Sequence, residues 1–206
     1  LSSLVTIVDT EAPNYIGQTD NHALTVAGTG GADVFVHTPG TTDQAGTIQV
    51  NSLLALSYAS LGAGGSVTAS GGAGTDTLVA NGTTVNDTFT VGAAGQVNLN
   101  ARVVLNVASV ETLTLEGFEG NDTFTLVPAI SASVYTTMNF NGGTQSSATG
   151  DRVNLVATAG DDDLVISGQT VSLGGKTVQS SGVEDIRLDA LAGNDLITYN
   201  GVVGIS

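Results

Sequence analysis

An internal repeat is the feature that most constrains the fold of this 206-residue chain. Four anchor residues recur at spacings of 75 or 73 residues, and they pair as Asp76 with Asp151, Asp87 with Asp162, Val110 with Val183 and Gly120 with Gly193. A weaker first copy has the same spacing between its apolar runs, with His22 at the position of Asp76. Because a fixed period is typical of repeat architectures, we expect three copies at about residues 4–66, 67–137 and 138–206.

Short segments with a period of two residues dominate each copy. In Thr112-Leu113-Thr114-Leu115 and Thr123-Phe124-Thr125-Leu126, threonine alternates with large apolar residues, as in half-buried strands. Clusters of Gly, Asn and Asp separate these runs and indicate turns. The segment Asn51–Leu61 suits either a helix or a strand. The pattern predicts an all-β chain and favours a repetitive parallel β-solenoid, similar to a right-handed β-helix. The uneven spacing of the strands keeps tandem β-sandwich modules as the alternative.

The charge balance excludes several classes of partner. Four Lys and Arg residues stand against nineteen Asp and Glu, for a formal net charge of -15. So few basic groups cannot neutralise a run of phosphates, which excludes nucleic-acid binding and electrostatic binding to anionic lipid. No apolar run reaches the roughly 18 residues of a membrane span. The chain has no cysteine, so it has no disulfide framework and no thiol chemistry.

Acidic turns carry the clearest motif. Gly71–Val79 matches the nonapeptide G-G-x-G-x-D-x-U-x at every defined position, U being a large apolar residue. This segment resembles the hemolysin-type (repeats-in-toxin) calcium-binding repeats of secreted bacterial proteins. The segments Val-Glu-x-Leu-x-Leu also resemble spacer repeats of long bacterial surface and adhesin proteins. The resemblance implies Ca²⁺ as a cofactor, and its candidate metal ligands are Asp33, Asp76, Asp87, Asp122, Asp151, Asp162 and Asp195.

A second interpretation of these turns needs no metal. In the family that the chain resembles, consecutive nonapeptides stack so that neighbouring turns share each ion. Here the aspartates of the acidic turns lie 11 to 43 residues apart, so calcium would bind only if the fold stacks the turns. Gly-Asn-Asp is also a good β-turn sequence in which the aspartate caps backbone amides. The run Asp161-Asp162-Asp163 has the same two interpretations, as a cation site or as a solvated loop tip.

Nothing in the spacing of the catalytic residue types indicates an enzyme. His22 and His37 are the only histidines, and no nucleophile motif accompanies them. A calcium-dependent polysaccharide-active enzyme is the least favoured possibility, because four Tyr, no Trp and three Arg supply a sugar site poorly. A glycan- or cell-binding adhesin module is the stronger alternative, and it predicts a concave patch with exposed Tyr15, Tyr58, Tyr135 or Tyr199 clustered together.

The function that the sequence favours is structural. Repeats supply length, and the last copy stops where Ser3 of another copy would continue its pattern. We therefore expect end-to-end self-association, as a homopolymer or a tandem array. The expected setting is the bacterial cell surface or exterior, in a fibre, surface layer, matrix or adhesin stalk that calcium stiffens.

Overall fold

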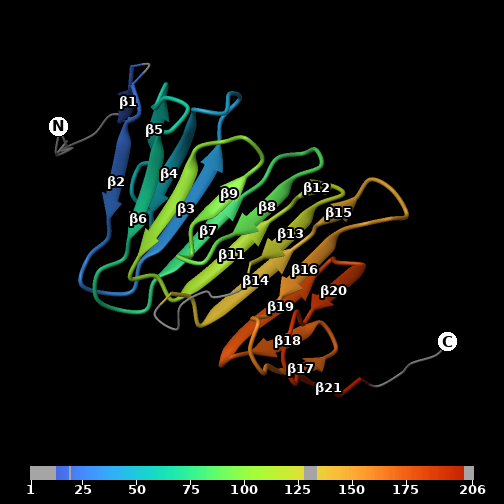
Figure 1. The fold of residues 1–206 in the computed structure, drawn as a ribbon. Helices are drawn as coiled ribbons and strands as arrows, with labels where there is room; N and C mark the ends of the chain where they lie inside the picture. Colours follow the sequence, from blue (N-terminus) through green and yellow to red (C-terminus); the bar gives the residue numbers. More distant parts are fainter. Residues whose placement is uncertain (1–12, 19, 128–133, 202–206) are drawn as a thin grey trace.

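The computed structural model describes residues 13–18, 20–127 and 134–201, and every regular element in this part of the chain is a β-strand (Figure 1). The larger sheet has the order β1-β5-β4-β3-β7-β11-β14-β19-β18-β17-β21. Its strands are β1 (Asn14–Ile16), β3 (Val34–Pro39), β4 (Gly46–Val50), β5 (Leu56–Ala59), β7 (Thr77–Asn81), β11 (Thr112–Glu116), β14 (Thr137–Asn141), β17 (Asp163–Ser167), β18 (Thr170–Leu173), β19 (Lys176–Ser181) and β21 (Leu196–Tyr199).

The smaller sheet has the order β2-β6-β10-β9-β8-β13-β16-β20. Its strands are β2 (Ala23–Ala27), β6 (Ser66–Ser70), β8 (Thr88–Val91), β9 (Val97–Leu99), β10 (Val104–Ala108), β13 (Thr123–Leu126), β16 (Arg152–Val156) and β20 (Asp185–Asp189). A two-stranded parallel pair, β12 (Glu119–Gly120) with β15 (Thr144–Gln145), lies outside both sheets. The prediction of an all-β chain is confirmed.

The chain passes back and forth between the two sheets and adds parallel strands to each. In the larger sheet β7 pairs in parallel with β3 and β11, and β14 joins β11 to β19. Equivalent residues stay in register, so Thr77, Thr112, Thr137 and Thr177 form one row across four strands. Figure 1 shows β1 and β2 at one end of the stacked strands and β20 and β21 at the other.

Three antiparallel meanders interrupt the parallel stacking and make the sheets mixed. They are β3-β4-β5, β8-β9-β10 and β17-β18-β19. The segment Asn51–Leu61, which suited a helix or a strand, contains strand β5. Each meander widens one sheet by two strands, which explains the uneven spacing of strands along the sequence.

The sequence repeat relates strands of opposite sheets. Asp76 precedes β7 of the larger sheet, whereas its equivalent Asp151 precedes β16 of the smaller one. In the same way the meander β8-β9-β10 of the smaller sheet corresponds to β17-β18-β19 of the larger one. A repeat therefore spans an odd number of crossings between the sheets. The boundaries that we expect between copies stay a prediction.

Alternate residues of both sheets point into one shared core. Inward positions are buried aliphatic or aromatic residues, and the outward positions are mostly threonine, asparagine and serine. Phe124 stacks between Phe89 and Phe140, with ring centroids 5.3 and 5.6 Å apart and planes at 11° in both pairs. Because Phe140 belongs to the other sheet, this stack ties the two layers together.

Truncation of the central aromatic ring tests this packing. Phe124 is fully buried, so Phe124→Ala is expected to lower the free energy of unfolding by about 3–5 kcal/mol through lost burial and a residual cavity. Urea denaturation measures the change. The control Val85→Ala, at a side chain that is 64% exposed, should stay within about 0.5 kcal/mol of the parent. Equal losses in both variants would contradict the assignment of Phe124 to the core.

Candidate functional site: ladders of buried aspartates

The seven aspartates predicted as metal ligands share one structural position. Each stands at the end of a turn, one residue before a strand. Asp33, Asp76, Asp87, Asp122 and Asp151 are 0–2% exposed, and Asp162 and Asp195 are half-buried. Buried carboxyl groups are rare unless they are paired or hydrogen-bonded, so the contacts of these side chains decide what they do.

The backbone amide of one aspartate donates a hydrogen bond to the carboxyl group of the aspartate in the neighbouring turn. Each series of such hydrogen bonds is called an aspartate ladder. The amide of Asp33 donates to Oδ1 of Asp76 over 2.7 Å, and the amide of Asp162 donates to Oδ1 of Asp195 over 3.1 Å. A longer ladder runs through three residues, which are Asp87, Asp122 and Asp151, with N–O distances of 2.7 and 2.6 Å. Each rung joins a turn to the turn of the neighbouring parallel strand.

Two glutamates continue the ladders. The amide of Asp76 donates to Oε2 of Glu111 over 2.8 Å, and the amide of Asp151 donates to Oε2 of Glu184 over 2.7 Å. These are the glutamates of the repeated Val-Glu motif. Their regular spacing is visible in the sequence, but it does not group them with the aspartates. Their longer side chains accept the same kind of backbone hydrogen bond from a different kind of turn.

One class of aspartate accepts several hydrogen bonds on its carboxyl group. Asp33, Asp87 and Asp162 each follow a threonine by four residues, and Oδ2 accepts hydrogen bonds from the amide and the hydroxyl of that threonine. In Asp33, Oδ1 also accepts from Nδ2 of Asn51 over 2.6 Å. The hydrogen bond from the Thr29 backbone is the main cause that keeps the pKa of Asp33 below its usual value. These aspartates begin the three meanders.

The other aspartates accept fewer hydrogen bonds on the carboxyl group. Asp76, Asp122 and Asp195 follow turns in which the residues four and two positions earlier have left-handed backbones, as at Phe118 and Gly120 with φ of 69° and 134°. Oδ2 of Asp76, Asp122 and Asp151 is buried and has no hydrogen-bond partner. Burial raises the pKa of Asp122 to about 7 and is also the main cause that raises the pKa of Asp151.

Glycine makes room for these carboxyl groups. A Cβ on Gly117 would collide with Oδ2 of Asp122 and with the carbonyl oxygen of Gly142. Gly71 and Gly142 occupy the same kind of position beside Asp76 and Asp151. None of these three glycines has a positive φ, so the absence of a side chain, and not backbone freedom, explains them. The first glycine of the nonapeptide thus has a packing role.

The structure brings the candidate metal ligands together in series of two or three, each joined by a backbone amide to the next carboxyl group. Among residues 13–18, 20–127 and 134–201, no group of three His, Cys, Asp or Glu side chains is placed to hold a metal ion. In the run Asp161-Asp162-Asp163, Asp161 accepts a hydrogen bond from the amide of Asn194, while Asp162 belongs to a ladder. The turns do stack, as calcium binding requires, but calcium itself stays a prediction.

Each histidine lies beside a tyrosine, His22 beside Tyr15 and His37 beside Tyr58, and the four tyrosines are spread over the structure. His37 is buried and its Nε2 lies 2.6 Å from the hydroxyl of Tyr58, and burial lowers the pKa of His37 to about 4. Tyr135 is buried and donates to the carbonyl of Gly95. Tyr15 on β1 and Tyr199 on β21 lie at opposite ends of the larger sheet. The four tyrosines therefore do not form the exposed cluster that the glycan-binding alternative predicts.

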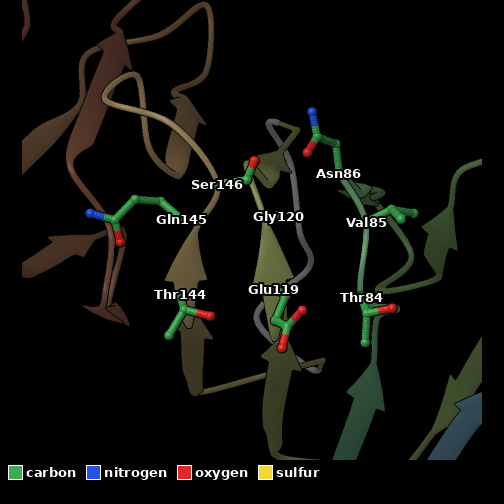
Figure 2. A pocket seen from close by; sticks show the side chains of 8 residues that line it. All are labelled: Thr84, Val85, Asn86, Glu119, Gly120, Thr144, Gln145 and Ser146. Carbon is green, nitrogen blue, oxygen red and sulfur yellow. The ribbon is translucent and has the colours of Figure 1, made fainter.

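A shallow groove of about 320 Å³ runs beside the extra pair β12-β15. Figure 2 shows three neighbouring segments around it, which are Thr84–Asn86, Glu119–Gly120 and Thr144–Ser146. Its lining is mostly small and neutral, with Glu119 as the charged member. Neither histidine nor a basic residue lines it in the described part of the chain, so this groove supplies no acid–base pair for catalysis.

The chain matches no protein-family model, no curated protein and no solved structure. The described residues contain no helix that could span a membrane.

The packing role of glycine gives a direct test. Gly117→Ala is expected to lower the free energy of unfolding by about 1–3 kcal/mol, because the new methyl group meets a buried carboxyl oxygen and a carbonyl oxygen. The matched control is Gly30→Ala, whose Cβ would meet no atom within 4 Å and whose φ is not positive. Thermal and urea unfolding of the two variants should separate them. A neutral Gly117→Ala would contradict the crowded geometry.

Proposed function

We propose that this chain is a non-enzymatic structural protein of the bacterial cell exterior that associates end to end. We also propose that its fold is a parallel β-solenoid, with the right-handed winding that parallel crossovers favour. The observation that carries the proposal is that both sheets end in edge strands at which a second copy could add its own strands. In the described residues β1 and β21 end the larger sheet, and β2 and β20 end the smaller one.

These edge strands have matching polarity. Each meander reverses direction twice, so β1, β3, β7, β17 and β21 all run the same way in the larger sheet. The same reasoning makes β2 and β20 parallel in the smaller sheet. A second copy can therefore add its first strands to the last strands of this one in parallel. A head-to-tail contact of this kind gives an open filament and not a closed dimer.

The last edge of the larger sheet is apolar, and in the described part of the chain two of its backbone amides point away from the sheet. Leu196, Ile197 and Tyr199 of β21 are 49–62% exposed. The amides of Leu196 and Asn200 donate to β17 and its preceding turn, so by alternation the amides of Ile197 and Tyr199 point away from β17. Exposed edges with unpaired amides are templates for strand addition. This edge therefore has both the apolar contact and the hydrogen-bond donors that another copy needs.

Calcium has a place in this proposal as a surface ion. With a net charge of -15, copies that meet end to end repel one another. Asp161, Asp163 and Asp189 are exposed near the last strands, and Asp20 is exposed near the first ones. Divalent cations at these acids would weaken the repulsion.

Assembly should accordingly be faster in millimolar calcium than in sodium chloride of equal ionic strength. Equal rates would contradict the role of calcium and leave the structural role standing.

A proline at one outward amide tests the end-to-end contact. Ile197→Pro removes a donor that points away from β17, so the folded chain should persist while filament length in electron micrographs falls at least several-fold. Light scattering gives the same comparison in solution. The control Ile197→Ala shortens the side chain and keeps the amide.

Three outcomes are distinguishable. Filaments of the parent that are lost in Ile197→Pro, with the β-sheet signal in circular dichroism unchanged, support the proposal. Unaltered filaments in Ile197→Pro would move the contact away from this edge. A parent that stays monomeric at high concentration, with and without calcium, would contradict self-association.

A further inference from the structure

The groove beside β12-β15 continues into a second hollow. This second hollow has a volume of about 540 Å³, and it shares Thr84, Glu119 and Thr144 with the first one of about 320 Å³. Binding sites for small molecules typically measure about 300–1,000 Å³, so each hollow has the volume of a ligand site. Because three residues line both hollows, the two form one continuous groove that suits a ligand built of linked units.

Three polar side chains at the centre of this groove are left for a ligand. Thr84, Glu119 and Thr144 are exposed, and in the described part of the chain none of their side chains has a hydrogen bond or an ion pair. Figure 2 shows them side by side on three neighbouring segments, and Glu119 pairs directly with Thr144 in the register of β12 and β15. The three side chains therefore present two hydroxyl groups and one carboxylate along a single line.

An exposed aromatic ring lines the larger hollow. Phe118 is 45% exposed, and its backbone has a left-handed φ of 69°, which is an unfavourable conformation for a residue with a Cβ. Gly72 stands at the same position, four residues before an aspartate, with a φ of 98°. The turn itself therefore does not require a side chain there. A ring that is kept on a strained backbone and left exposed indicates that it acts at the surface.

The combination of these groups matches a neutral sugar. The hydroxyl groups of a pyranose ring both donate and accept hydrogen bonds, so they suit a carboxylate that only accepts and threonine hydroxyls that do both. The C–H bonds on one face of the same ring pack against an aromatic side chain. Glu119 is the charged residue of the groove, and it repels phosphate, sulfate and uronic acid groups. Calcium, which takes about 6–8 oxygen ligands, would find one carboxylate here.

We propose that this groove binds a neutral oligosaccharide, with one sugar ring stacked on Phe118 and hydrogen-bonded to Glu119 and to the two threonines. The next unit of the sugar chain lies in the adjoining hollow. The site is contained within one copy of the chain, so it does not depend on the end-to-end association proposed above. In a filament the sites would repeat along its length, and weak binding at each copy would add up to firm attachment.

Replacement of the ring by glycine tests the site while the fold is kept. Phe118→Gly removes the aromatic face, and glycine adopts the left-handed backbone readily, so the urea midpoint should stay close to that of the parent. The matched control is Leu191→Gly. Leu191 stands at the equivalent turn position with a φ of 59° and an exposure of 52%, and it does not line the groove.

Saturation-transfer NMR with neutral tetrasaccharides of glucose, mannose and galactose measures the binding, because it detects the sugar whether the protein is a single copy or a filament. At about 10 mM sugar, irradiation of the aromatic protons of the parent should transfer magnetisation to the C–H protons of at least one tetrasaccharide. The transfer should fall about five-fold in Phe118→Gly and stay unchanged in Leu191→Gly. Tetragalacturonate should bind the parent more weakly than the neutral sugar does, and Glu119→Gln should reduce this difference.

The results that would overturn the proposal are equally direct. One is the absence of transfer from the unaltered parent to any of the neutral tetrasaccharides, which needs no variant. Another is transfer that persists in Phe118→Gly, because the sugar would then lie elsewhere on the surface. Equal binding of tetragalacturonate and of the neutral sugar to the parent would contradict the role of Glu119. Filament formation, measured separately by electron microscopy, does not enter any of these outcomes.

Discussion

The hydrogen bond from a backbone amide to a carboxyl group in the neighbouring turn is the interaction on which the rest of the structure depends. Parallel strands bond one another along their length, but the turns before them contain amides outside the strand pairing. Asp122 accepts from the amide of Asp87, and its own amide donates to Asp151. The carboxyl group of Asp122 therefore accepts the amide of the preceding turn, and the amide of Asp122 finds its acceptor in the following turn. These hydrogen bonds hold successive turns in one register.

This constraint explains other choices of residue around the ladders. Glycine stands where a side chain would fill the space of the carboxyl group, as at Gly117 beside Asp122. Asn51 and Asn100 take left-handed backbones after β4 and β9, and each donates its side-chain amide to an aspartate that begins a meander. These two hydrogen bonds connect the antiparallel meanders β3-β4-β5 and β8-β9-β10 to the aspartate ladders. Structural use of these residues accounts for the acidic turns without a catalytic role.

Much of the fold follows from the sequence because its signals are local. Alternation of threonine with leucine or phenylalanine predicts strands such as β11 and β13, and the structure places their apolar residues inside. The turn position of the aspartates is equally local, since Gly-Asn-Asp favours a turn wherever it occurs. The partner of each aspartate is not local. Asp76 lies 43 residues from Asp33 and 35 from Glu111, so their hydrogen bonds exist only once the strands have stacked.

The sequence by itself determined the β-strand content, the position of the turns and the repeat, because each depends on residue type and on short-range spacing. Tertiary structure alone decided which sheet each repeated strand joins. Asp76 and Asp151 are equivalent in sequence, yet they precede strands of different sheets, because a repeat contains an odd number of crossings. It also decided which carboxyl groups gain three donors and which keep an unpaired oxygen. That difference arises from the residues that stacking brings near each aspartate, and stacking is a property of the whole chain.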